Sequence, residues 1–307
     1  STERSQHMTT QITSIDTNNY AAMAKAMGMA SEGGTEKAKS STLARLRINH
    51  SPIMGTAEVN GKQINMEVVS GGTYKLEIPD GPTYYAPSVR IRAHAQRFMY
   101  KRFIKGMGDR PNRYVKTVMA DNLNTDLKDN DGGFNCGKPA GFIKDFQSLP
   151  EKTQALIKEI KRVRVVFGTV ELLNPIDNTG AETSVEELPF IWEIENRDAF
   201  TDVGVVFKQF KKMKLVPPAH HITANTEERK LPNGNSFFLP TVALDLTNTL
   251  KLADKEQNIF ADFMGWIQNY NEYIINSWSD KARPKDEDID GIDSIVDIDI
   301  EDDEIVV

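Results

Sequence analysis

From Leu43 onward the chain alternates apolar and polar residues over several short runs, such as ARLRINH, AEVNGKQINMEVV and TYKLEI. A period of two is typical of β-strands that bury one face. Asn60-Gly61 lies between two of these runs and predicts a hairpin turn, and the segment 79–82 (PDGP) predicts a second turn. The pattern therefore predicts antiparallel strands joined by tight turns in this part of the chain.

Further strands are expected along much of the remaining sequence. They lie in segments 88–105, 113–121, 162–173 and 188–194, with a hairpin over 219–247 that turns at Pro232-Asn233-Gly234. The loop 106–112 would join the first two of these strands. Residues 122–149 are rich in Asn, Asp and Gly, which is typical of loops.

Apolar residues at helical spacing occur in four segments. The spacing of Phe200, Val203 and Phe207 predicts a helix over 198–214, and Pro150 is placed to start a helix over 150–161. A long amphipathic helix is expected over 252–278. The segment 18–30 (NNYAAMAKAMGMA) predicts a short helix near the N-terminus.

Regular alternation of strands and helices is missing from this pattern, which argues against a doubly wound α/β fold. We expect a mainly β architecture with added helices (α+β). Its centre would be an antiparallel barrel with insertions, similar to the oligonucleotide-binding (OB) barrel, followed by a long C-terminal helix. The expected regions are a helix and flexible linker in 1–42, a folded domain in 43–278, and a disordered acidic tail in 279–307.

Composition narrows the class of protein. No run approaches the roughly 18 consecutive apolar residues of a membrane-spanning helix, so we expect none. The single cysteine, Cys136, cannot form an internal disulfide, which fits a reducing, cytosolic setting. The segment 1–8 resembles a cleavage and cloning remnant ending in the natural start Met8. No signal segment follows it.

The net charge of −7 is unevenly distributed along the 307 residues. Eleven of the 44 acidic residues lie between Asp286 and Glu304, and no basic residue follows Lys285. The rest of the chain therefore has 37 basic against 33 acidic residues. An acidic tail of this density cannot bury enough surface to fold alone. Such a tail can occupy a basic groove, present its apolar end to a partner, or serve only solubility.

The segment 88–116 combines basic and aromatic residues. It contains nine Lys and Arg residues and a single acid, Asp109, so we expect its cations to be free for phosphates. The candidate phosphate contacts are Arg90, Arg92, Arg97, Lys101, Arg102, Lys105, Arg113 and Lys116. The candidate stacking residues are Phe98, Tyr100, Phe103 and Tyr114. The alternative is a solvated strand face whose aromatic rings belong to the core.

Two further basic clusters and one loop supplement this segment. The clusters are Lys158, Lys161, Arg162 and Arg164, and Lys208, Lys211, Lys212 and Lys214; lysines on a helix are usually only solvated. In the loop, Phe134, Lys138 and Phe142 are placed to reach a ligand. Its GGFNCGK stretch has the spacing of a phosphate-binding loop. However, Pro139 stands where Ser or Thr would hold magnesium, so we reject that function.

No residue pattern specifies a reaction. His50, His94 and the pair His220-His221, with one cysteine, do not make a tetrahedral zinc set. Acidic pairs such as Glu186-Glu187 are expected at the surface. We therefore expect a protein without catalytic activity, metal or cofactor.

The basic-aromatic region, the strand-rich body and the acidic tail together resemble the replication single-stranded DNA-binding proteins of bacteriophages. The resemblance implies an OB fold that coats single-stranded DNA in the cytoplasm of an infected bacterial host. It also implies a tail that recruits a polymerase, helicase or primase. Carried over, the tail role falls on Asp299, Glu301, Asp302, Asp303, Glu304, Ile305, Val306 and Val307. Tails in that family often end in phenylalanine, whereas this chain ends in Val307.

Two other classes stay open at this point. A regulatory factor could bind a polymerase through the acidic tail without coating DNA. A nuclease would need a carboxylate cluster for magnesium, and the spacing nominates none.

Overall fold

The computed structural model describes residues 43–282. The strands are β1 (Ala44–Asn49), β2 (Ile53–Val59), β3 (Lys62–Val69), β4 (Thr73–Glu77), β5 (Thr83–Ala86), β6 (Ser88–Ile104), β7 (Arg113–Lys116), β8 (Ile160–Leu173), β9 (Leu188–Ile194), β10 (Ile222–Lys230) and β11 (Ser236–Leu244). The helices are α2 (Glu151–Glu159), α3 (Arg197–Met213) and α4 (Asp254–Ala282), with short 3-10 turns η2 (Asn135–Gly137), η3 (Phe146–Ser148) and η4 (Pro217–Ala219).

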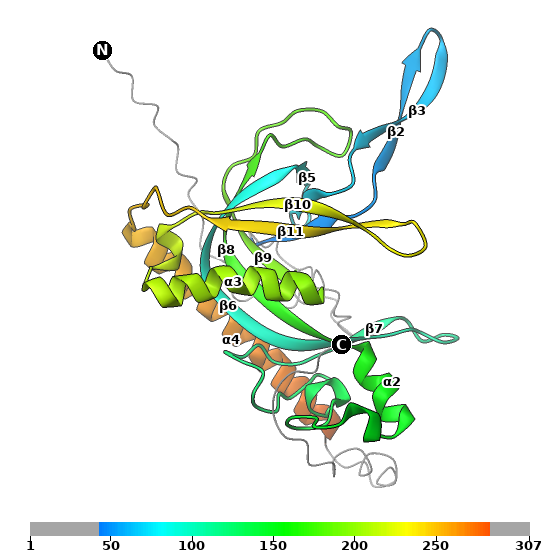
Figure 1. Ribbon diagram of the computed structural model, residues 1–307, viewed down its shortest axis with the longest axis vertical. Helices are drawn as coiled ribbons and strands as arrows, with labels where there is room; N and C mark the ends of the chain where they lie inside the picture. Colours follow the sequence, from blue (N-terminus) through cyan, green and yellow to red (C-terminus); the bar gives the residue numbers. More distant parts are fainter. Residues whose placement is uncertain (1–42, 283–307) are drawn as a thin grey trace.

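Most strands join one nine-stranded sheet in the order β11-β10-β6-β8-β9-β1-β4-β5, with β7 added to β6. Neighbouring strands are antiparallel except β1 and β9, which are parallel. The strands β2 and β3 form a separate hairpin that projects from the body (Figure 1). The fold is therefore mixed α/β, with a mostly antiparallel sheet and a C-terminal helix.

The predicted strands and turns are confirmed. Asn60 and Gly61 join β2 to β3 with φ angles of 54° and 76°, as a type I′ turn requires. The 79–82 turn joins β4 to β5, and 106–112 joins β6 to β7. The β6–β8 ladder has one irregularity, at Ala93/Ala95. A Cβ on the nearby Gly168 would lie 2.0 Å from the Arg92 carbonyl oxygen, so only glycine fits there.

The predicted helices are present with shifted ends. The first, α2, ends at Glu159, where β8 begins, so its last turn is shorter than predicted. Asn196 caps α3 by accepting bonds from the amides of Asp198 and Ala199. The last helix, α4, extends to Ala282, and residues 279–282 therefore belong to it, not to the predicted tail. The predicted helix over 18–30 and the rest of the tail lie outside the described residues.

Two hydrophobic cores use opposite faces of the same strands. One fills the curled part of the sheet under α3, where Val166, Trp192 and Phe210 are buried. The other lies between the sheet and α4, where Phe167 and Trp266 pack with ring centroids 5.4 Å apart. Figure 1 shows α3 and α4 on either side of the β6–β8 pair. None of the helices within residues 43–282 is both long and apolar enough to cross a membrane.

The predicted barrel is not confirmed, because no hydrogen-bond ladder closes the sheet within residues 43–282. The two ends of the sheet nevertheless approach each other. The Tyr74 hydroxyl of β4 donates to the Asn225 carbonyl of β10 at 2.8 Å. The Phe238 amide of β11 donates to His50 at 3.1 Å, and the Thr226 hydroxyl donates to the Gly72 carbonyl. Hydrogen bonds that involve side chains thus connect the two ends of the sheet, although no ladder between strands connects them.

We expect Tyr74→Phe to lower the free energy of unfolding by about 1–2 kcal/mol, because the Asn225 carbonyl loses its donor while the buried ring is kept. Urea denaturation checks this. Tyr84→Phe, in the adjoining strand β5, is the matched control and should change stability less. Equal effects of the two substitutions would show that the contact does not tie the edges together.

Candidate nucleic-acid interface

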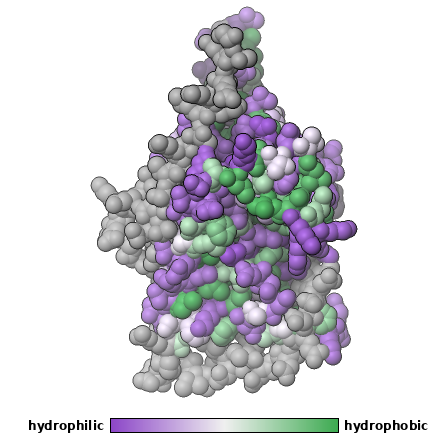
Figure 2. Space-filling model, turned by 90° about the vertical axis from the view of Figure 1, so that its left-hand side faces the viewer, coloured by the Kyte–Doolittle hydropathy of each residue, from purple (hydrophilic) through white to green (hydrophobic). Residues whose placement is uncertain are grey.

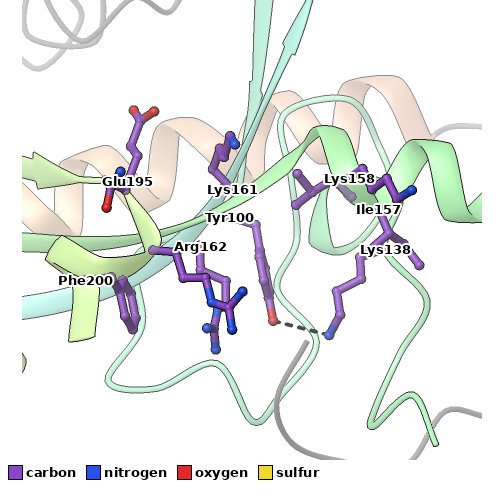
Figure 3. A pocket seen from close by; sticks show the side chains of 11 residues that line it. Tyr100, Lys138, Ile157, Lys158, Lys161, Arg162, Glu195 and Phe200 are labelled. Atoms are coloured by element: carbon purple, nitrogen blue, oxygen red, sulfur yellow. Dashed lines mark hydrogen bonds between the residues drawn. The ribbon is translucent and has the colours of Figure 1, made fainter. Parts of the chain in front are cut away.

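Two hollows lie between α3 and β6. The first, called here the Tyr100 hollow, encloses about 240 Å³ beside Tyr100, Arg162 and Phe200, at the start of α3 (Figure 3). The second, the Gln96 hollow, encloses about 540 Å³ beside Gln96 and Phe210, towards the end of α3. Both hollows are bounded by β6 and α3, and together they are called here the α3 trough.

Basic side chains from four segments converge on the α3 trough: the loop before α2, α2 itself, β8 and α3. They are Lys138, Lys158, Arg162, Arg197, Lys211 and Lys214; the Arg97 and Lys161 side chains point from the opposite face of β6 and β8. Among the described residues that line the trough, Glu195 alone carries a carboxylate, and it forms an ion pair with Lys101. The trough is therefore positively charged along its length.

Several of these cations are available to a ligand. Lys158, Lys211 and Lys214 are exposed, and none of them forms an ion pair with a carboxylate in residues 43–282. The Lys158 ammonium lies over the Phe146 ring at 5.9 Å, and the Arg162 guanidinium over the Phe200 ring at 5.2 Å. A phosphate could bind these groups without displacing a carboxylate.

Aromatic rings form the floor of the trough. Phe98 and Phe200 lie 5.9 Å apart between their ring centroids, and Tyr100 follows Phe98 on the same face of β6. The Lys138 ammonium lies 3.5 Å from the Tyr100 hydroxyl and 5.4 Å from the centre of its ring (Figure 3). Flat rings beside cations are the combination that single-stranded nucleic acids require.

Arg164 separates the two hollows and fixes α3 to the sheet. Its guanidinium donates to the Phe200 carbonyl at 3.0 Å and to the Gln96 side chain at 2.7 Å. A Cβ on Gly204 would lie 2.3 Å from this guanidinium, so the glycine allows the helix to approach. Burial, and then the neighbouring Arg162, lower the pKa of Arg164 to about 10. Arg164 is thus a structural residue beneath the trough.

Of the residues singled out from the sequence, Phe98, Tyr100 and Lys138 line or contact the trough. The Arg97 side chain lies on the opposite face of β6, where it donates to the Met264 sulfur of α4 at 3.3 Å. The other cations of 88–116 were expected to be free, and that expectation was wrong for most of them. Ion pairs join Arg90 to Glu171 (2.8 Å), Arg92 to Glu256 (3.1 Å) and Arg113 to Asp131 (2.9 Å), and Arg97 itself lies 3.6 Å from Asp121. The neutralising carboxylates come from distant parts of the chain, which a count within the segment misses.

Lys101 and Lys116 belong to a buried charge cluster around Glu193. The Glu193 carboxylate lies 3.6 Å from Lys116, 4.0 Å from Lys101 and 3.4 Å from Arg45, and its side chain is 4% exposed. Burial lowers the pKa of Lys116 to about 8. Burial alone would raise the pKa of Glu193, but these cations hold it below its ordinary value. We therefore leave Lys101 and Lys116 out of the proposed interface.

The remaining predicted residues lie away from the trough. Phe103 and Tyr114 contact each other with centroids 5.2 Å apart, on the opposite face of β6 and β7 from Tyr100. Phe134 packs against Trp278 of α4. Lys105 is exposed near the β6–β7 loop, and Phe142 is half-buried. Arg102 donates to the Cys136 carbonyl at 3.1 Å.

The GGFNCGK stretch forms a turn organised by Asp129. That carboxylate accepts hydrogen bonds from the amides of Gly133 (2.9 Å) and Cys136 (3.1 Å). A short 3-10 turn, η2, lies within this stretch, and no α-helix begins between Lys138 and α2, so the stretch does not lead into the helix that a phosphate-binding loop requires. Within residues 43–282, no three His, Cys, Asp or Glu side chains group as metal ligands.

Sequence reasoning missed Phe200, Phe207 and Arg197 as site residues. The phenylalanine spacing predicted the helix, yet it did not show which side chains would border an open hollow. The second and third basic clusters were a usable signal. They lie far apart in sequence but reach the same trough, because α3 crosses the sheet beside β6 and β8.

We expect Glu193→Gln to destabilise the fold by about 3–5 kcal/mol, because it leaves Lys116, Lys101 and Arg45 buried without their shared carboxylate. Glu171→Gln is the control: its pair with Arg90 is well exposed, so we expect a loss of about 0–1 kcal/mol. Thermal or urea unfolding measures both.

The lowered pKa of Glu193 also predicts how the stability of the fold changes with pH. A glutamate with a lowered pKa in the folded state contributes stability above its ordinary pKa and loses it as the pH falls through the lowered value. Acidification below pH about 4 should therefore destabilise the unmodified protein more than Glu193→Gln. If the unmodified protein and Glu193→Gln lose equal stability on acidification, the Glu193 carboxylate does not stabilise the fold in this way.

No protein-family model, curated protein or solved structure matches this chain. The function must therefore be argued from the trough itself.

Proposed function

We propose that this protein binds single-stranded DNA without sequence preference along the α3 trough. The observation that carries the proposal is the convergence of six Lys and Arg side chains and a floor of aromatic rings on one hollowed surface. Phosphates need cations along a path, and unpaired bases need flat faces. The trough provides cations and aromatic rings next to each other.

Each group has a distinct part in the proposed mechanism. Lys158 and Arg162 would contact phosphates at one end of the trough, and Lys211 and Lys214 at the other. Bases would stack between them on Phe200, which is partly exposed, whereas Tyr100 beneath it is 4% exposed and belongs to a core cluster. Stacking tolerates every base, so this arrangement favours coating a strand over recognising a sequence.

The curled sheet also supports this proposal. We propose that it is an open relative of the OB barrel, in which side-chain bonds such as Tyr74 to Asn225 replace the closing ladder. In an OB fold the ligand lies across the strands of one face. Here α3 narrows that face to a trough.

The acidic tail fits the same proposal. Its dense negative charge resembles that of the ligand, so it would compete for the trough when DNA is absent. Once DNA displaces it, the tail would be free to recruit a replication polymerase, helicase or primase. We propose that the protein acts in phage DNA replication or recombination in the cytoplasm of the infected bacterial host, without catalytic activity of its own.

We expect Lys158→Ala combined with Lys211→Ala to weaken binding of labelled oligo(dT) uniformly across sequences. The slope of log affinity against log salt should fall by about 0.7 for each phosphate that no longer meets a lysine. Phe200→Leu should cost about 1–3 kcal/mol of binding, because a base can no longer stack on the ring. Fluorescence titration over a range of salt concentrations measures both effects.

The matched control is Lys62→Ala combined with Lys230→Ala, which removes two exposed lysines that do not line the trough. It should leave both affinity and salt slope nearly unchanged. If the chain does not bind oligo(dT) at low salt even without residues 286–307, the proposal fails, and a tail-mediated regulatory factor becomes the better explanation.

We expect deletion of residues 286–307 to tighten oligo(dT) binding at low salt and to have little effect at high salt, where screening weakens the tail's competition. The same deletion should abolish recruitment of the partner enzyme. Equal affinities of the full and shortened chains at low salt would contradict a competing tail.

A further inference from the structure

The β2–β3 hairpin is an arm with one apolar face. It forms its own two-stranded sheet and projects from the body (Figure 1). The register sets Gly55 opposite Met66 and Ala57 opposite Ile64, which places these four residues on one face. The opposite face carries polar residues such as Thr56 and Asn65.

The outer part of this apolar face is open to solvent. Val59 is 49% exposed, Ile64 47% and Met66 46%. A two-stranded ribbon is at best marginally stable in water, and a row of exposed large apolar residues on one face marks an interaction site. Within residues 43–282, nothing covers this part of the arm.

A second apolar surface, the end patch, lies on the side of the molecule away from the arm. It consists of Met213, Val216, Leu246 and Leu252, which are between 46% and 52% exposed. The Leu250 amide donates to the Ala219 carbonyl at 2.8 Å and holds the two contributing segments together. Figure 2 shows apolar residues gathered on this end, bordered by hydrophilic ones.

The charges of the two surfaces are opposite. The arm, residues 53–69, contains Glu58, Lys62 and Glu67, a net charge of −1. The segments that form the end patch, 211–216 and 246–255, contain five lysines and one acid, Asp254. A negative arm is unsuited to nucleic acid, whereas it complements a positive end patch.

We infer that the arm of one copy of this protein docks its apolar face on the end patch of the next copy. The contact is heterologous, because arm and patch are different surfaces at different ends of the molecule. Such contacts build open chains instead of closed dimers. The end patch also borders the Gln96 hollow, which is lined by Leu215 and Pro217 on either side of Val216. Docking would therefore place successive troughs next to one another and make binding to a long strand cooperative.

Cross-linking between variants that each carry one added cysteine tests the contact directly. The natural Cys136 is buried, and burial raises its pKa well above the ordinary value, so it stays unreactive. Mixing full-length Ile64→Cys with full-length Val216→Cys, without DNA, should give disulfide-linked pairs of the two different variants under mild oxidation. Pairs of Ile64→Cys with itself would show arm-to-arm contact, and no cross-link above the level of either variant alone would show no contact; both would overturn the inference.

A second experiment measures the effect on binding. Ile64→Thr combined with Met66→Thr keeps strand-forming residues but removes the apolar face. It should lower affinity for an oligo(dT) long enough for several copies by about tenfold, equivalent to about 1.4 kcal/mol, and leave affinity for a single-site oligo(dT) unchanged. The matched control, Thr56→Ser combined with Asn65→Ser, alters the opposite face of the arm and should change neither.

The outcomes separate this inference from the proposed function. If the threonine variant loses affinity for the single-site strand, the arm contacts DNA and the inference is overturned. If it binds both strands as the unmodified protein does, the arm does not link copies during binding. If no oligonucleotide binds at all but the Ile64→Cys and Val216→Cys variants cross-link, self-association stands and the proposed function fails.

Discussion

The antiparallel ladder between β6 and β8 is the interaction on which the rest of this structure depends. It runs from the pair of Ser88 with Leu173 at one end to the pair of Arg102 with Ile160 at the other. One face of the ladder carries the core under α3, and the other carries the core under α4. The same strands form the floor of the α3 trough. Packing and the candidate function therefore share one pair of strands.

The length of this ladder also creates the central electrostatic constraint. Strands this long carry charged residues into the interior, where an unpaired charge is costly. The fold compensates with carboxylates brought from far along the chain, such as Glu193 beside Lys116 and Glu256 beside Arg92. Lys158, Lys211 and Lys214 have no carboxylate partner within residues 43–282 and border the trough, and this is why the trough is basic.

The local structure could be predicted from the sequence to a large extent. The Asn60-Gly61 turn, the period-two runs and the spacing of Phe200, Val203 and Phe207 each depend on neighbouring residues, and the structure confirms the elements they predict. Closure of the sheet could not be predicted, because it depends on contacts such as Tyr74 with Asn225, which are 151 residues apart. Contacts of this kind between distant strands produce no periodic pattern of residues in the sequence.

The sequence by itself determined where the strands, turns and helices lie, and that basic and aromatic residues are concentrated in 88–116. Only the tertiary structure decided which of those charges are free. Arg90 meets a carboxylate 81 residues away and Lys101 one 94 residues away, while lysines from α2 and α3 join the trough in their place. Secondary structure follows from residues close in sequence, whereas the charge of a surface depends on which distant residues the fold brings together.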